Sequence, residues 1–141
     1  MTIKSTKQSR LGQVWTPDWM VSHMLDLAGC TGDAVLSSRI LEPSFGTGAF
    51  LREIVARILK ESSARGMTAE DTASTIDNNV HGIEIDKEIY KSTVDELVEM
   101  CIKQGVHTSF PNLLNMDAMD IDPSSKYDIV VANPPYVRVH L

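Results

Sequence analysis

Residues 39–60, RILEPSFGTGAFLREIVARILK, join a short apolar run, a glycine-containing turn and a long amphipathic segment. The run at 39–41 is ended by a proline, which is typical of a β-strand. From 49 to 60 the apolar side chains recur with a period of about 3.6 residues, which predicts a helix packed on a sheet. Gly46 and Gly48 permit the tight turn between them. The stretch therefore predicts a strand–turn–helix unit.

The rest of the chain continues this alternation of strands and helices. The other expected elements are helices at 17–28 and 87–105, a short helix after a capping signature at 68–71, and strands at 81–86, 112–115 and 127–132. We expect Thr16 to serve as the N-cap of the first helix. Strands that alternate with helices of this length imply parallel pairing through crossovers, so the predicted fold class is α/β with a parallel sheet.

The composition restricts the possible classes of protein. A chain of 141 residues is long enough for one domain, and its net charge of −6 argues against a wide grip on a nucleic-acid backbone unless another domain supplies it. Cys30 and Cys101 have no partner at ligand spacing, so we expect reduced thiols and no metal site. The chain shows neither a bilayer-spanning apolar run nor a secretory signal, so we expect a cytoplasmic protein without a membrane partner.

Polar or glycine-rich clusters follow all four predicted strands. They are EPSFGTG at 42–48, EID at 84–86, DA at 117–118 and NPPY at 133–136. Ligands of open parallel sheets bind beyond the carboxyl ends of the strands, so we expect these clusters to share one site. The third glycine of a dinucleotide fingerprint is replaced by Leu51, and the P-loop lysine is absent. A nucleoside without a pyrophosphate is therefore favoured over NAD or ATP.

Two of these clusters suit a nucleoside, although each has a second interpretation. Glu84 ends the second strand, where an acid accepts hydrogen bonds from ribose hydroxyls; it is alternatively a solvated acid. Asp117 could accept a hydrogen bond from an adenine amino group, but an ordinary acidic loop has the same composition. Asp120 and Asp122 lie so close that the sequence leaves open which Asp occupies this position.

The NPPY cluster suits the chemistry of an amine. Asn133 supplies a side-chain carbonyl, and Pro134 and Pro135 make the turn stiff by fixing φ and removing donors. Acceptors aimed at an exocyclic amine would stabilise the positive charge that develops when its nitrogen attacks a methyl electrophile. Tyr136 would stack on a planar substrate. The alternative interpretation is a strand that simply ends at two prolines.

Five motifs in this order resemble the N6-adenine DNA methyltransferases of the gamma motif order. They are Thr16-Pro17, EPSFGTGAFL, GIEID, MDAMD and NPPY, and together they extend over nearly the whole chain. The resemblance implies a Rossmann-like methyltransferase fold and S-adenosyl-L-methionine as the cofactor. It also implies methyl transfer to the N6 amine of adenine in double-stranded DNA, as part of a restriction-modification system.

The resemblance also implies roles for individual residues. The implied target-amine pocket consists of Asn133, Pro134, Pro135 and Tyr136. The implied cofactor-binding residues are Thr16 and Pro17, which would close over the methionine part; Gly46, Thr47 and Gly48, which would line it; Glu84 for the ribose; Ile85, Asp117 and Ala118 for the adenine; and Glu42 and Pro43 of the glycine turn.

The resemblance sets an expectation for the domain arrangement. Residues 1–38 would be an N-terminal segment and helix, and 39–141 a partial methyltransferase domain with only the first four strands of the family's sheet. We expect a fragment that is inactive alone and reaches DNA through a missing downstream domain. The exposed edge of the fourth strand would pair with a complementary C-terminal fragment or a second copy.

Two other functions keep some of these features. A protein-glutamine or RNA amine methyltransferase would retain NPPY, but the short N-terminal segment with its Thr-Pro pair favours DNA. The other alternative is a catalytically inactive cofactor-binding fragment that serves as an interaction module.

Overall fold

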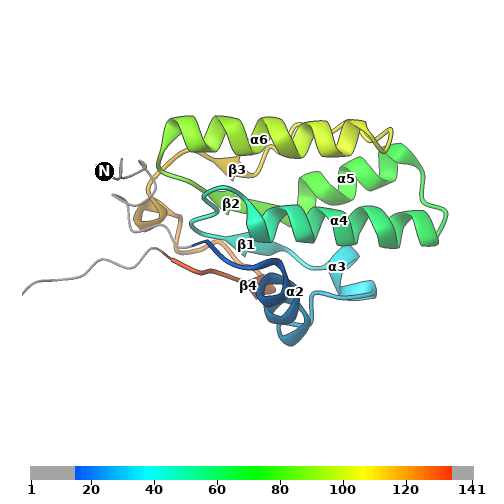
Figure 1. The fold of residues 1–141 in the computed structure, drawn as a ribbon, viewed down its shortest axis with the longest axis horizontal. Coiled ribbons are helices and arrows are strands. Elements are labelled where there is room, and N and C mark those ends of the chain that lie inside the picture. Colours follow the sequence, from blue (N-terminus) through cyan, green and yellow to red (C-terminus); the bar gives the residue numbers. More distant parts are fainter. Residues whose placement is uncertain (1–14, 135–141) are drawn as a thin grey trace, which may run out of the picture.

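The computed structural model describes residues 15–134, which form one parallel sheet with helices packed beside it (Figure 1). The strands are β1 (Ile40–Glu42), β2 (Val80–Ile83), β3 (Leu113–Leu114) and β4 (Ile129–Val130). They lie in the order β3-β2-β1-β4, and every pair is parallel. In this register Ile40 pairs with both Val80 and Ile129. The predicted α/β fold with a parallel sheet is confirmed.

Helix α4 is the centre of the helical layer. The helices are α2 (Asp18–Leu27), α3 (Asp33–Ser37), α4 (Ala49–Ala64), α5 (Ala69–Asn79) and α6 (Lys87–Ile102), with a 3₁₀ turn η1 at Ala118–Asp120. In Figure 1, α4 lies between α6 and α2, and it also contacts α3, α5 and β2. Its inward side chains Leu51, Ile54, Val55 and Ile58 are fully buried, as the apolar period predicts. No helix in the described part of the chain is long and apolar enough to cross a membrane.

Two helices depart most from the predicted elements, and β2 and β4 are shorter than predicted. Helix α5 runs over 11 residues, whereas the sequence predicted only a short helix. The Thr68 hydroxyl accepts from the Asp71 N–H as its capping signature predicts, but Ile76 is the one strongly apolar side chain that the helix buries, so apolar spacing gave little signal. Helix α3 was not predicted, because its five residues bury only Val35 and are too short to show a period.

The strand order determines where a ligand can lie. The chain crosses from β1 to β2 and then to β3 on one side of β1, and afterwards returns to place β4 on the other side. The segments that follow β1 and β4 therefore diverge. In open parallel sheets, such a reversal of strand order leaves a crevice at the carboxyl ends of the strands.

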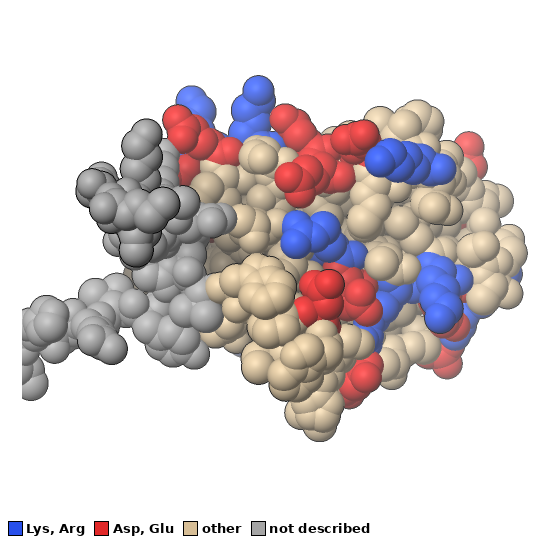
Figure 2. Space-filling view, viewed as in Figure 1, with Lys and Arg blue, Asp and Glu red and all other residues tan. Residues whose placement is uncertain are grey.

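Charged residues of both signs are mixed on the molecular surface. On the face shown in Figure 2, Lys and Arg side chains alternate with Asp and Glu and form no continuous basic area. A wide contact with a phosphate backbone requires such an area. The lack of a continuous basic area on this face agrees with the net negative charge of the chain.

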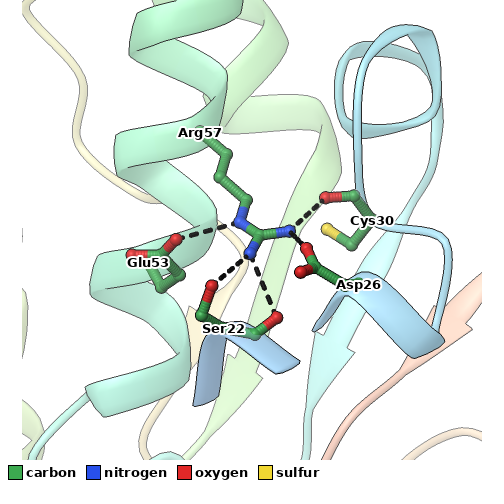
Figure 3. Close-up of polar contacts among 5 residues, drawn as sticks. All are labelled: Ser22, Asp26, Cys30, Glu53 and Arg57. Carbon is green, nitrogen blue, oxygen red and sulfur yellow. Dashed lines mark hydrogen bonds and ion pairs between the residues drawn. The ribbon is translucent and has the colours of Figure 1, made fainter. Parts of the chain in front are cut away.

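Arg57 of α4 fixes the position of α2 (Figure 3). Its Nη1 donates to Asp26 Oδ1 at 2.8 Å and to the Cys30 carbonyl at 3.0 Å, and its Nη2 donates to the Ser22 carbonyl and hydroxyl at 3.1 and 3.0 Å. Nε donates to Glu53 Oε1 at 2.9 Å. With 15% of its side chain exposed, Arg57 joins α2 to α4, the helix that follows the glycine turn.

We expect Arg57→Met to lower the free energy of unfolding by about 2 kcal/mol, because the carbonyls of Ser22 and Cys30 lose their charged donor. Arg65→Met is the matched control, since the ion pairs of Arg65 lie at the surface and it is 41% exposed. Arg65→Met should lower the free energy of unfolding by a clearly smaller amount. Urea unfolding measures both variants, and equal losses would contradict the role of Arg57 as a clamp.

Candidate functional site

A cavity of about 520 Å³ lies at the carboxyl ends of the strands. The turns after β1 and β2 and the segments after β3 and β4 contribute to its wall. Its volume lies within the range of roughly 300–1,000 Å³ that is usual for small-molecule sites. The cavity therefore occupies the crevice that the strand order predicts.

The glycine turn after β1 is held from two sides. The Phe45 N–H donates to the Ile83 carbonyl of β2 at 3.0 Å, and the Thr93 hydroxyl of α6 donates to the Gly46 carbonyl at 2.8 Å. Gly46 and Gly48 have φ values of 54° and 84°, which only glycine adopts without strain. A Cβ on Gly48 would lie 2.6 Å from the Thr93 methyl group, whereas a Cβ on Gly46 would meet no atom within 4 Å. The absence of a side chain at Gly48 thus allows the turn to pack closely on α6, and its absence at Gly46 leaves space at the cavity.

Glu84 joins this turn to the end of β2. Its Oε2 accepts from the Gly46 N–H at 2.9 Å, and its Oε1 accepts from the Asp86 N–H at 2.8 Å. The residue is 5% exposed, so the interpretation as a solvated acid is wrong. Each carboxylate oxygen has a second lone pair and can accept a further donor from a ligand. Glu84 therefore fixes the turn and also offers acceptors to the cavity.

Glu42 is a second buried acid on the same wall. It is 3% exposed, and its Oε1 accepts from the Ser44 N–H at 2.8 Å. Burial raises the pKa of the Glu42 carboxyl to about 7; the Ser44 N–H opposes this rise and Glu84 adds to it. Within residues 15–134 neither Glu42 nor Glu84 forms an ion pair with Lys or Arg. The cavity is therefore complementary to a positive charge or to hydrogen-bond donors.

Ile85 and Asp117 add an apolar side chain and an acid to the cavity lining. Ile85 lines the cavity, although 66% of this large apolar residue is exposed. Asp117 also lines it, and its Oδ1 accepts from the Met119 N–H at 2.9 Å at the start of η1. Asp120 and Asp122 lie outside the lining. An apolar wall with an acceptor at its edge suits a flat heteroaromatic ring.

Thr16 and Asn133 meet at the remaining wall. The Asn133 Nδ2 donates to the Thr16 Oγ1 at 2.8 Å, although the two residues are 117 positions apart. Thr16 is 5% exposed. Its expected role as an N-cap is wrong, because Pro17 occupies the N-cap position of α2 and no side chain caps that helix. The Thr16 hydroxyl accepts from the Asn133 amide instead.

Most predicted site residues surround this cavity. Those that line it are Thr16, Glu42, Pro43, Gly46, Thr47, Glu84, Ile85, Asp117, Ala118 and Asn133. Pro17 and Gly48 do not: Pro17 is the N-cap of α2, and Gly48 packs against α6. Pro134 is not part of the lining, and Pro135 and Tyr136 lie outside the described residues.

Several lining residues were given no individual role by sequence reasoning. They are Trp15, Ser44, Phe45, Ala49, Phe50, Ile83, Asp86 and Met116. Each stands directly beside a predicted site residue or one position further along, so proximity within the motifs was the available signal. Within residues 15–134 no group of three or more His, Cys, Asp or Glu residues is arranged to hold a metal ion.

The close packing of the glycine turn on α6 predicts unequal effects of two glycine substitutions. Gly105→Ala introduces left-handed strain of roughly 1 kcal/mol in open space, since φ is 73° and no atom lies within 4 Å. Gly48→Ala adds the clash with Thr93 and should cost about 2 kcal/mol or more in free energy of unfolding. Thermal or urea unfolding compares the two variants, and a smaller cost for Gly48→Ala would contradict the packing described for the turn.

The raised pKa of Glu42 predicts a pH dependence of stability. The folded state holds a proton that the unfolded state releases above pH 4.5, so this contribution to stability is lost as the pH rises from about 4.5 to about 7. Glu42→Gln has no ionisable group at this position, so this fall in stability with rising pH should not occur. Relative to wild type, the variant should gain roughly 2 kcal/mol in free energy of unfolding between about pH 5 and about pH 8. Urea unfolding at both pH values tests this, and parallel pH profiles would refute it.

Comparison with known proteins identifies sequence relatives over nearly the whole chain. The family model for N-6 DNA Methylase matches residues 2–140. The type II methyltransferase M.BstVI of Geobacillus stearothermophilus is 33% identical over 143 residues, which cover 92% of this chain and 25% of the relative. The type II methyltransferase M.PaeR7I of Pseudomonas aeruginosa is 31% identical over 140 residues, with coverage of 92% and 24%. The chain thus spans about a quarter of the length of these relatives.

Solved structures share the fold at lower sequence identity. A cryo-EM structure of a DrdV–DNA complex matches with a TM-score of 0.57 and 20% identity, covering 80% of this chain and 11% of that one. The crystal structure of a predicted N6-adenine-specific DNA methylase from Listeria monocytogenes str. 4b F2365 matches with a TM-score of 0.55 and 18% identity, covering 93% and 38%. These likenesses support the Rossmann-like arrangement of the sheet.

Proposed function

The chain belongs to the N-6 DNA methylase family, and from this premise we propose that its cavity binds S-adenosyl-L-methionine for methyl transfer to the N6 amine of adenine in DNA. The observation that carries the proposal is the buried Glu84 at the end of β2, which is bonded to the glycine turn and lines the cavity. The carboxylate at a strand end and the turn beside it form a site for a nucleoside.

The residues of the cavity fit each part of this cofactor. The second lone pairs of Glu84 would accept from the ribose hydroxyls, and Ile85 would pack on the adenine with Asp117 and Ala118 at its edge. The space above Gly46 admits the methionine part beside Pro43 and Thr47. Glu42 and Glu84 complement the positive charge, because the described residues provide no Lys or Arg partner for either.

The amine pocket would lie next to the cofactor. When bound, S-adenosyl-L-methionine would supply a methyl group on a positively charged sulfur. The Asn133 side chain and the carbonyl of Pro134 would accept the two hydrogens of the target amine, which stabilises charge that develops on its nitrogen. Pro135 would stiffen the same turn and Tyr136 would stack on the base.

The substrate and partners belong to the same proposal. M.BstVI and M.PaeR7I are type II methyltransferases, which supports a restriction-modification role on double-stranded DNA in the cytoplasm. The mixed charges in Figure 2 favour DNA contacts outside this face of the domain. In the described sheet β4 pairs with β1 alone, and Val130 is 58% exposed. We propose that this edge pairs with a further polypeptide segment or a second copy.

Isothermal titration with S-adenosyl-L-methionine tests the cavity. Glu84→Ala should weaken binding by about tenfold or more, because the ribose acceptor and the anchor of the glycine turn are both lost. Ile85→Ala should weaken it by roughly fivefold without affecting folding, since that side chain is exposed.

Glu99→Ala is the control, because Glu99 is 68% exposed on α6 and lies outside the cavity lining. Its affinity should match that of the wild type. Absence of binding heat in the wild type, or unchanged affinity in both cavity variants, would contradict the proposed function.

A further inference from the structure

The hydrogen bond between Asn133 and Thr16 links two segments that approach the cavity from different elements. Thr16 precedes α2, and Asn133 follows β4. The donor is the Asn133 Nδ2 and the acceptor is the Thr16 Oγ1, at 2.8 Å. Thr16 is 5% exposed and both residues line the cavity, so the contact lies partly buried at the place where the target amine would lie.

Thr16 is attached to a rigid part of the domain. Directly after it, the Pro17 carbonyl accepts from the Met20 and Val21 N–H groups at 2.9 and 3.1 Å. Val21 and Leu25 of α2 are buried in the core, and the Arg57 clamp holds the same helix from α4. The Thr16 hydroxyl is therefore a fixed acceptor.

Asn133 lies three residues beyond the end of β4. The strand ends at Val130, and the Val131 N–H donates to the Leu41 carbonyl of β1 at 3.0 Å. The terminal torsion of an Asn side chain is broad and roughly two-fold, so hydrogen bonds to its amide decide which way its oxygen and nitrogen point. In the flipped state, the amide would present its own N–H groups to an amine.

We propose that Thr16 is a positioning residue for Asn133, whose hydroxyl holds the donor side of the amide and turns the carbonyl oxygen toward the target amine. This inference rests on the proposed function and deepens it. The resemblance placed Thr16 with the methionine part of the cofactor; its bond to Asn133 assigns it to the amine pocket. A residue of this kind affects the turnover step and leaves the affinity for the cofactor intact.

Methylation kinetics of the full-length protein test the assignment, with a duplex that the wild type methylates. Thr16→Val keeps the shape of the side chain but removes the acceptor, so kcat should fall by about tenfold or more. Thr16→Ser restores the hydroxyl and should keep kcat within about threefold of wild type. The Kd for S-adenosyl-L-methionine should stay within about twofold in both variants. Thr31→Val, at an exposed threonine after α2, is the matched control and should leave kcat unchanged.

NMR provides a readout that is independent of activity. In wild type and Thr16→Ser, one side-chain amide proton of Asn133 should exchange slowly with water, and in Thr16→Val this protection should disappear while the fold is retained. Unchanged kcat in Thr16→Val, or a lower cofactor affinity with kcat preserved, would overturn the assignment of Thr16. A wild-type protein that binds no cofactor and methylates no adenine would instead refute the proposed function.

Discussion

The carboxylate of Glu84 holds together the part of the molecule on which the site depends. One oxygen accepts from Gly46 of the glycine turn, and the other accepts from Asp86, whose own carboxylate caps α6 through the N–H groups of Glu88 and Ile89. A single buried acid thus connects the end of β2, the turn after β1 and the start of α6. Burial of a carboxylate is costly unless it is hydrogen-bonded, and these backbone donors meet that cost.

A second chain of contacts brings the N-terminal segment to the same cavity. Arg57 of α4 holds α2, Thr16 lies two residues before the start of α2, and Thr16 bonds to Asn133 beyond β4. Helix α4 begins immediately after the glycine turn. It therefore sets the relative position of the residues proposed to hold the cofactor, such as Gly46, and of Asn133, which is proposed to hold the target amine. The proposed transfer requires these residues to lie side by side, and the order β3-β2-β1-β4 allows it.

Much of this arrangement was predictable from local patterns, and the rest depends on tertiary contacts. The apolar periods of α4 and α6 and the residues after each strand predicted the fold and most of the cavity wall. Helix α5 was underestimated because it buries little apolar surface. The expected N-cap role of Thr16 was wrong, because Thr-Pro before a helix suggests a cap, and only the return of β4 beside β1 brings Asn133 to its hydroxyl. The burial of Glu42 likewise depends on neighbours that are remote in sequence.

The most direct test of the central claim is the position of the bound cofactor relative to Glu84 and its neighbours. Intermolecular nuclear Overhauser effects can be recorded on protein with labelled methyl groups in the presence of S-adenosyl-L-methionine. We expect cross-peaks from the adenine protons to the methyl groups of Ile85 and Ala118, and from the ribose protons to the Gly46 amide. A bound cofactor with no cross-peak to any of these three residues would contradict the account.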